Sequence, residues 1–386
     1  MIAPHDLLAW GLVAVAGAAL GRIVIALVTP LVAIDAAGRP VPPPPGFGRA
    51  FQVAAVLGAL ALWWWEVVAR GQLPVGSPPA DDAGPLVVRY AAHLVLFALL
   101  AAASWVDLRE RIIPDVITMP GVLAGLAWMT LAPDALLPIV TEVSPAYAPP
   151  PFQSLPPLLL PDVLGLAGGL RDGAVPEWLE SRPAWTGLVA ALVVFGGWWR
   201  VCTAPFYEPP AAPGGLAAWL CEPRNIALVA GSAGIVAAWW RGGWGWHGLL
   251  TSLAGIVVAA GMIWLTRAGA SRALGREAMG LGDVTLMAMV GAWLGWQACV
   301  LACFIAVFVG LVHGGLQVLL HRESELPFGP SLCLGSAAVV VAWRPLWARA
   351  SVSFERPLEM AAVIAAVIGL TAVSLMVWRR LRSSLG

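Results

Sequence analysis

The chain alternates between long apolar stretches and shorter polar or proline-rich segments. The longer stretches have the roughly 20 residues that a helix needs to cross the hydrocarbon core of a bilayer. They predict an all-α fold, a polytopic integral membrane helical bundle with about 9–11 transmembrane helices. The predicted stretches are 7–29, 51–69, 86–106, 115–132, 185–199, 225–240, 247–267, 282–297, 299–320, 330–347 and 358–378.

Composition agrees with this pattern. The chain is 60% hydrophobic and 11% charged, with a mean hydropathy of +0.82, which excludes an ordinary soluble domain. The formal net charge is zero, so nothing points to nucleic acid as a partner. If the N-terminus lies outside, most arginines fall in the loops and the tail on the inner side, as the positive-inside rule requires.

Two breaks in the apolar pattern divide the chain into three parts. Residues 1–132 hold the N-terminal membrane helices and a first aspartate motif, and residues 246–386 hold the C-terminal membrane helices and a second one. Between them, residues 133–245 form an insertion, predicted to be a proline-rich outer loop (133–184) with one or two extra helices. The inner loop 35–50 contains four consecutive prolines and is too short to be a domain.

Two aspartates stand out at the ends of apolar stretches. Asp283 opens one stretch directly after Gly280 and Gly282, and Asp107 closes another, after which Pro114-Asp115 opens the next. Charged side chains at the end of a membrane helix are costly to bury and are functional candidates by default. The two glycines let the backbone approach another group closely. The orientation that the arginines favour puts both aspartates at the cytoplasmic face.

Two carboxyl groups at neighbouring helix ends can act as an acid/base pair. Like charges in close proximity push their proton affinities apart, so that one group is protonated while the other is ionised. The ionised group can draw a proton from water, and the protonated group can donate one to a peptide carbonyl. The residues therefore predict an aspartic protease that uses no metal and no cofactor.

The motifs resemble those of a known family. Gly280-Leu281-Gly282-Asp283 resembles the Gly-x-Gly-Asp motif of type IV prepilin peptidases, a family of intramembrane aspartic proteases, and 291–296 continues in the style of that family. Asp107 followed by Pro114-Asp115 resembles the family's first aspartate motif. Pro327-Phe328-Gly329-Pro330 is similar to the segment that opens a later helix. The motifs occur in the family's order.

The resemblance implies an endopeptidase that removes the basic leader peptide from type IV prepilins or pseudopilins. Asp107 and Asp283 would be the catalytic pair, at the cytoplasmic face of the bacterial inner membrane. The implied partners are these substrates and the lipid bilayer. The implied supporting residues are Gly280, Gly282, Pro114, Asp115, Thr285, Pro327, Phe328 and Gly329.

Three features depart from the family pattern. Many members carry a zinc-type Cys-x-x-Cys domain after the first helix, associated with N-methylation of the product, but residues 30–50 contain no cysteine. The resemblance therefore implies cleavage without N-methyltransferase activity. Thr285 stands where the family usually has a lysine, which removes a charge partner of the pair. The insertion also separates Asp107 from Asp283 by more residues than is usual.

Two other classes of membrane protein can carry paired acidic residues. A presenilin-like or signal-peptide-peptidase-like protease would carry a Tyr-Asp motif and a later Pro-Ala-Leu, whereas this chain has Val106-Asp107 and Pro327-Phe328. A non-catalytic membrane scaffold or a proton-coupled transporter could also use paired acids. A transporter is expected to have polar residues at mid-membrane depth and matching halves. Here the two acids lie at helix ends and no repeat is visible.

Three other polar residues have structural interpretations. Asp115 is expected to be the N-cap of the helix that it opens. Glu66 is expected to pair with Arg70, four residues on, near the outer interface. His93 is expected to make a hydrogen bond to a neighbouring helix.

Overall fold

The computed structural model describes residues 4–31, 46–73, 83–138, 185–203, 222–321, 327–354 and 359–370, with the single residues 373 and 376. Within these ranges the regular secondary structure is helical throughout, which confirms the all-α prediction. Most of the inner loop 35–50 and of the outer loop 133–184 lies outside the described residues, as does Cys221.

Where they are described, the predicted apolar stretches fall on helices. Residues 359–370, at the end of the described chain, are also helical. Short helical turns η1 (Thr29–Leu31), η2 (Trp64–Val68) and η3 (Pro133–Ala135) follow α1, α2 and α4. The main helices are α1 (Pro4–Val28), α2 (Phe47–Trp63), α3 (Gly84–Glu110), α4 (Asp115–Leu131), α7 (Trp185–Thr203), α9 (Pro223–Arg241), α10 (Gly243–Leu274), α11 (Leu281–His321), α12 (Gly329–Val341) and α13 (Trp343–Phe354).

Six of the described helices are long and apolar enough to cross a membrane, fewer than the nine to eleven expected. They are Leu8–Leu31, Phe47–Val68, Gly84–Glu110, Trp185–Thr203, Gly243–Leu274 and Leu281–His313. The pair α12 and α13, bent by 87°, makes a seventh if it counts as one span. The count falls because stretches 282–297 and 299–320 join into α11, because α4 and 359–370 are short, and because α9 is less apolar than the helices that qualify. A lipid bilayer is the environment that suits helices of this length and apolar character, so the chain is an integral membrane protein.

Glycines determine how α10 and α11 meet. A Cβ added at Gly255 would overlap the carbonyl group of Gly291, and a Cβ at Gly291 would overlap that of Gly255. The two backbones are therefore in direct contact, as small residues permit in membrane bundles. Gly295 takes part in the same contact, because a Cβ added at Gly255 would lie 3.0 Å from its Cα. The φ of 76° and ψ of 175° at Gly295 also interrupt α11.

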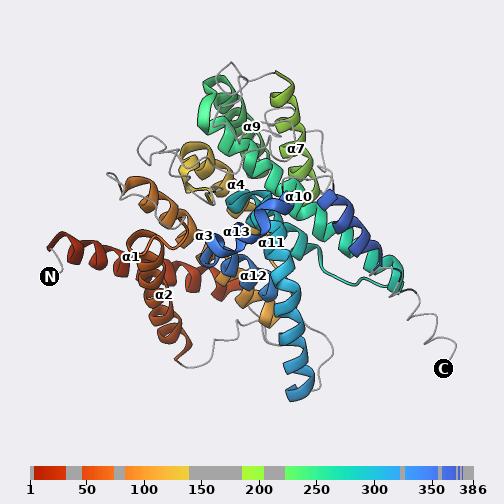
Figure 1. Ribbon diagram of the computed structural model, residues 1–386, viewed down its shortest axis with the longest axis horizontal. Helices are drawn as coiled ribbons and strands as arrows, with labels where there is room; N and C mark the ends of the chain where they lie inside the picture. The colour runs from red at the N-terminus through yellow and green to blue at the C-terminus, as the bar shows by residue number, and fades with distance from the viewer. Residues whose placement is uncertain are drawn as a thin grey trace.

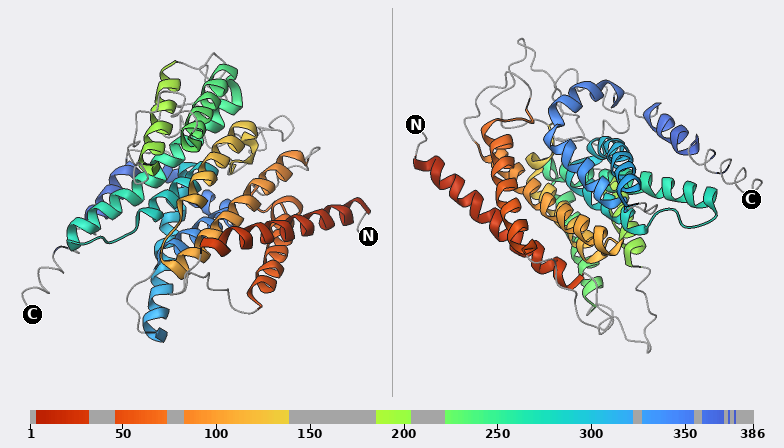
Figure 2. Two further views of the ribbon diagram at one scale, coloured as in Figure 1. Left: turned by 180° about the vertical axis from the view of Figure 1, so that it is seen from behind. Right: turned by 90° about the horizontal axis from the view of Figure 1, so that it is seen from below.

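Figure 1 shows α11, α12 and α13 at the centre of the molecule, with α7 and α9 together at one end. Helix α1 lies at the edge of the molecule in both views of Figure 2 and packs on α2. The core is filled by large side chains of α11, among them Leu286, Met287, Met289 and Trp293, which are essentially inaccessible. The Trp293 indole N–H donates to the Gly121 carbonyl at 2.9 Å, which joins α11 to α4.

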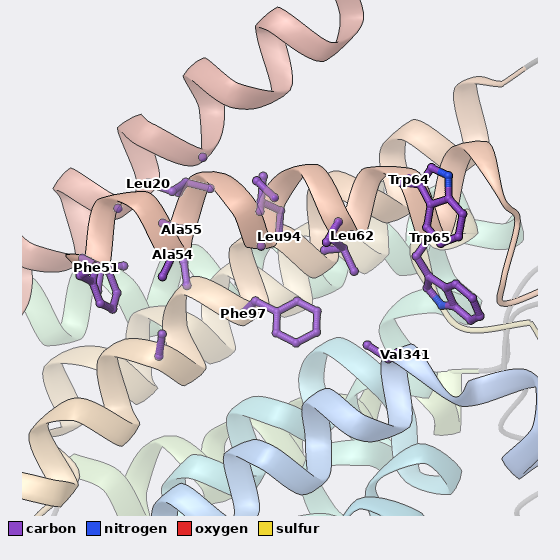
Figure 3. A pocket seen from close by; sticks show the side chains of 18 residues that line it. Leu20, Phe51, Ala54, Ala55, Leu62, Trp64, Trp65, Leu94, Phe97 and Val341 are labelled. Atoms are coloured by element: carbon purple, nitrogen blue, oxygen red, sulfur yellow. The ribbon is translucent and has the colours of Figure 1, made fainter. Parts of the chain in front are cut away.

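A cavity of about 590 Å³ separates the α1–α2 pair from α3. Phe51 lies at one end of it and Trp64 and Trp65 at the other, while Phe97 of α3 faces α2 across the space (Figure 3). Its lining residues are all glycine or apolar. Beside this apolar cavity, the Tyr90 hydroxyl of α3 donates to the Ala59 carbonyl of α2 at 3.2 Å.

Candidate active site

Asp107 lies in the last turn of α3. The helix ends at Arg111, which adopts the left-handed conformation with a φ of 56°, and the Arg111 N–H donates to the Asp107 carbonyl at 2.9 Å. The chain then runs through Ile113 to Pro114, and α4 begins at Asp115. This tight reversal places Asp107 at a helix end, as the sequence predicted.

Asp283 lies in the first turn of α11, directly beyond the two glycines. Gly282 packs against the turn that follows α3: a Cβ added here would lie 2.9 Å from Cβ of Ile113 and 3.2 Å from its N and O atoms. A larger residue at Gly282 would push the two aspartate segments apart. The glycine requirement inferred from the motif thus has a steric cause for Gly282. An added Cβ at Gly280 would meet only the Gly282 backbone nitrogen, at 3.8 Å.

The two carboxyl groups face the same cleft. Asp107 is 5% exposed and Asp283 is 8% exposed, and they are near enough to interact electrostatically. Both line a cavity of about 820 Å³. Its other lining residues are Arg111, Ile112, Ile113, Leu274, Arg276, Glu277, Ala278, Met279, Gly280, Leu281, Gly282, Pro327 and Phe328. Helix ends that are far apart in the sequence therefore meet around one space.

Gly329, the first residue of α12, completes the surroundings of Asp107. Its backbone N–H lies within hydrogen-bonding reach of the Asp107 carboxyl group. A Cβ at this position would overlap Oδ2 of Asp107. That oxygen is buried and has no hydrogen-bond partner among the described residues. A buried carboxylate oxygen without a partner is costly and calls for a functional explanation.

Pro114, Asp115 and Thr285 lie beside the cleft and are not among the residues that line it. The expectation that Asp115 is an N-cap is wrong: the N-cap is Pro114, and Asp115 is the first helical residue, with no capping bond. Its carboxyl group instead makes side-chain hydrogen bonds with Thr118 and Thr285. The Thr285 hydroxyl also lies 3.1 Å from the Gly282 carbonyl. Thr285 therefore joins α4 to the start of α11, and its hydroxyl contacts neither aspartate of the pair.

The segment between α10 and α11 forms one wall of the cleft and is held by two residues of α10. Arg267 forms an ion pair with Glu277, and its Nε donates to the Met279 carbonyl at 2.8 Å. Ser271 accepts a hydrogen bond from the Ala278 N–H at 3.1 Å. These bonds fix the approach to Gly280 and hence the position of the Gly-x-Gly-Asp motif.

Sequence reasoning missed one pair next to the aspartates. The Cys333 thiol makes a side-chain hydrogen bond with Ser104 and is close to both carboxyl groups. Ser104 precedes Asp107 by three residues and Cys333 follows Gly329 by four, so each lies one helical turn from a motif residue. Helical spacing was the signal that could have identified them.

A second buried polar group lies near the other end of α3. Glu66 was expected to pair with Arg70, but its partner is His93. Glu66 is 2% exposed, and its Oε1 lies 2.7 Å from Nδ1 of His93. Gln72 donates to the same Oε1 at 3.0 Å and to the Val340 carbonyl at 3.0 Å. The interhelical hydrogen bond expected for His93 is therefore present, with Glu66 as its partner. We refer to Glu66, Gln72 and His93 as the distal cluster.

The fold and the cleft define a polytopic helical membrane protein with paired carboxyl groups at the ends of two helices. Residues 223–315 match the sequence profile of the type IV leader peptidase family. This segment includes Asp283, whereas Asp107 lies outside it. The resemblance inferred from the motifs is confirmed: the chain carries the sequence of this family over α9, α10 and most of α11.

Curated relatives agree with the family match. The chain is 35% identical over 103 residues to a prepilin leader peptidase/N-methyltransferase of Aeromonas salmonicida (strain A449), covering 23% of this chain and 35% of the relative. It is 38% identical over 104 residues to the protein of the same name from Pectobacterium carotovorum, covering 23% and 37%. The chain thus spans about a third of the length of these relatives. No solved structure matches it.

Proposed function

We propose that this protein is an intramembrane aspartic endopeptidase that removes the leader peptide from prepilins or pseudopilins. The observation that carries the proposal is that Asp107 and Asp283, from distant parts of the chain, line one cleft while both are almost completely buried. The family match over residues 223–315 and the names of the relatives support the choice of substrate.

The chemistry follows from two carboxyl groups that share a small space. Two like charges this close resist ionising together, so the pair holds one proton between them. The ionised carboxylate takes a proton from a water molecule, whose oxygen then attacks the scissile carbonyl carbon. The protonated carboxyl group donates to the carbonyl oxygen, and the tetrahedral intermediate collapses with proton transfer to the leaving amine. Each step conserves protons within the pair and the water, and none needs a metal.

The surroundings of Asp107 suit it to receive the water. The nearby Gly329 N–H orients the carboxyl group, and the adjoining cleft has room for a water molecule beside the pair. The cleft wall formed by 276–281 and by Pro327 and Phe328 combines apolar side chains with Arg276 and Glu277, and would hold an extended peptide beside the pair. Arg111 and Arg276 in the same wall can contact peptide carbonyl groups. Substrate binding and acid/base chemistry would thus use adjacent surfaces of one cleft.

Location and product follow from the same proposal. The arginine distribution favours an orientation with this cleft at the cytoplasmic face, where a basic leader would lie before export, and the family resemblance implies the bacterial inner membrane. We also propose that the product terminus is not methylated, because residues 30–50 lack the cysteines of the domain associated with that step. The relatives carry the name N-methyltransferase as well, so this part of the proposal has its own readout in the experiment.

The test is leader cleavage in membranes. A pilin-like substrate from the same genome is co-expressed with the wild type, with Asp107→Asn or with Asp283→Asn, and the substrate N-terminus is read by mass spectrometry. Asp134→Asn serves as a matched control, since Asp134 lies beyond α4 at the opposite end of the bundle. The proposal requires cleavage by the wild type and the control only, with no added methyl group. Cleavage by either dyad variant at the wild-type rate would refute it.

A further inference from the structure

A cavity of about 770 Å³ lies between α4, α7, α9 and α10, at the end of the bundle where α7 and α9 stand together (Figure 1). Its volume is within the range of small-molecule sites, roughly 300–1,000 Å³. Most of its lining is glycine or apolar, including Leu126, Phe195, Ile235, Trp246 and Leu249. The Thr130 hydroxyl, which also lines it, already donates to the Leu126 carbonyl at 2.6 Å. The interior therefore suits a hydrocarbon chain and offers little to a sugar or a nucleotide.

This cavity is remote from the catalytic cleft. Residues 243–246 and Leu249, at the start of α10, line it, whereas Leu274, the last residue of the same helix, lines the cleft with the aspartates. At about 1.5 Å of rise per residue, the 25 residues between them span roughly 37 Å, more than the hydrocarbon core of a bilayer. The orientation that places the cleft at the cytoplasmic face puts this cavity at the outer leaflet.

The mouth of the cavity carries one positive charge. Arg241, the last residue of α9, is exposed and is the only charged side chain among the lining residues, all of which are described. Trp244 also lines the cavity and is 40% exposed, and the neighbouring Trp240 is 79% exposed. Exposed tryptophans at a helix end are typical of the membrane–water interface. An arginine beside them lies at the depth of lipid head groups.

We propose that this cavity binds one anionic phospholipid of the outer leaflet, with an acyl chain between α4, α7, α9 and α10 and the phosphate at Arg241. An apolar interior at the depth of the acyl chains and a single cation at the depth of the head groups match the two parts of such a lipid. Basic pockets between transmembrane helices bind anionic head groups by the same electrostatic attraction. The bound chain would fill the space between the α7–α9 pair and the core helices.

The apolar cavity beside α1 and α2 makes a useful contrast (Figure 3). It is lined by apolar residues and glycines with no charged group among them, so it offers a lipid no head-group contact. Charge at the mouth is what distinguishes the cavity at Arg241 and selects its occupant.

The test measures lipid binding and needs no peptidase activity, so its outcome is independent of the proposed function. Purified, delipidated protein is mixed with phosphatidylglycerol or phosphatidylcholine, and bound lipid is counted by native mass spectrometry. A Cβ added at Gly234, which lines the cavity, meets nothing within 4 Å, so Gly234→Leu places a side chain in the space without a clash. Gly261→Leu is its matched control, because Gly261 is equally unobstructed but is not in this lining.

We expect the wild type to retain one phosphatidylglycerol about fivefold more tightly than phosphatidylcholine, the preference that one interfacial arginine supplies at about 1 kcal/mol. Arg241→Gln should remove this preference, and Gly234→Leu should weaken retention of both lipids. Gly261→Leu and Arg349→Gln, a change at an exposed arginine of α13, should leave both unchanged.

Three results would overturn the proposal. Equal retention of the two lipids by the wild type would remove the role of charge. Unchanged binding in Gly234→Leu would mean that the lipid lies on the surface and leaves the cavity empty. Displacement of bound phosphatidylglycerol by soluble glycerol phosphate at comparable concentration would identify a free phosphate site that takes no acyl chain.

Discussion

Two buried polar groups lie toward opposite ends of α3, and they use the same types of residue differently. At one end, Asp107 faces a cleft of about 820 Å³ together with Asp283, and one of its carboxylate oxygens has no partner among the described residues. In the distal cluster, Oε1 of Glu66 is bonded to His93 and Gln72, while its buried Oε2, like Oδ2 of Asp107, has no partner among the described residues. The second carboxyl group and the adjoining cleft, rather than an unpartnered oxygen, distinguish the site at Asp107 from the distal cluster.

The distal cluster also has a mechanical connection to the cleft. Gln72 bonds both Glu66 and the Val340 carbonyl near the end of α12, and His93 belongs to α3. The opposite ends of these two helices supply Asp107 and the Gly329 N–H. The cluster therefore fixes α3 against α12 at the ends of these helices that lie opposite the carboxyl pair.

The largest difference between the carboxyl pair and the distal cluster is expected in the rate of leader cleavage. Asp107→Asn and Asp283→Asn should each lower the rate of leader cleavage by about 10²–10⁴-fold, the contribution of a positioned acid or base. Thermal unfolding in detergent should change little, because the amide has the shape of the carboxyl group. If a variant lost thermal stability together with activity, the aspartate would have a structural role like that of Glu66.

In the distal cluster, substitution is expected to lower stability strongly and the cleavage rate only slightly. His93→Ala leaves Glu66 buried without its closest partner, and a buried polar group that loses its hydrogen-bond partner costs about 1–3 kcal/mol. The measurement is thermal or denaturant unfolding of the purified protein. Per folded molecule, cleavage should fall far less than in the aspartate variants. Combining His93→Ala with Glu66→Leu tests the pairing, since removal of both partners should cost less than the sum of the single changes.

Two glycines of α12 are expected to differ in the same way, with smaller effects on kcat and on stability. A Cβ at Gly329 would overlap the Asp107 carboxyl group, whereas a Cβ at Gly335 would overlap the Ala302 carbonyl of α11. Gly329→Ala should therefore lower kcat, by about tenfold or more, because it displaces a reacting group. Gly335→Ala should lower the unfolding temperature and leave the kcat of folded protein near that of the wild type. Equal effects of the two changes on kcat would contradict this division.

The same comparison explains what the sequence could predict. Asp107 and Asp283 were found because each belongs to a contiguous motif at the end of an apolar stretch, and the helix ends do lie in one cleft. Glu66 was misassigned because its partners come from a neighbouring helix and the following turn, which local i,i+4 spacing does not show. Likewise, Cys333 meets Ser104 only once α12 packs on α3. Local patterns identify helix ends, and packing between helices decides the partners.

The described residues contain fewer membrane crossings than the sequence predicted, for a similar reason. Apolar composition does not distinguish a full span from a shorter buried helix such as α4, because both are surrounded by apolar groups. Nor does it show that stretches 282–297 and 299–320 form one helical element interrupted at Gly295. The cavity at Arg241 is formed by four helices, two of them from the predicted insertion, and its lining has no contiguous motif.

The smallest predicted effect concerns the turn that follows each polar group. Arg70, after Glu66, and Arg111, after Asp107, are the two non-glycine residues with positive φ in the described chain, at 52° and 56°. An L-residue in this conformation costs about 1–2 kcal/mol, which glycine avoids. Arg70→Gly and Arg111→Gly should thus gain stability from relief of this strain, measured as a rise of a few degrees in the unfolding temperature. Only Arg111 lines the cleft, so only Arg111→Gly should also change KM for the peptide. A change in KM with Arg70→Gly instead would show that the distal cluster acts on the cleft through α3.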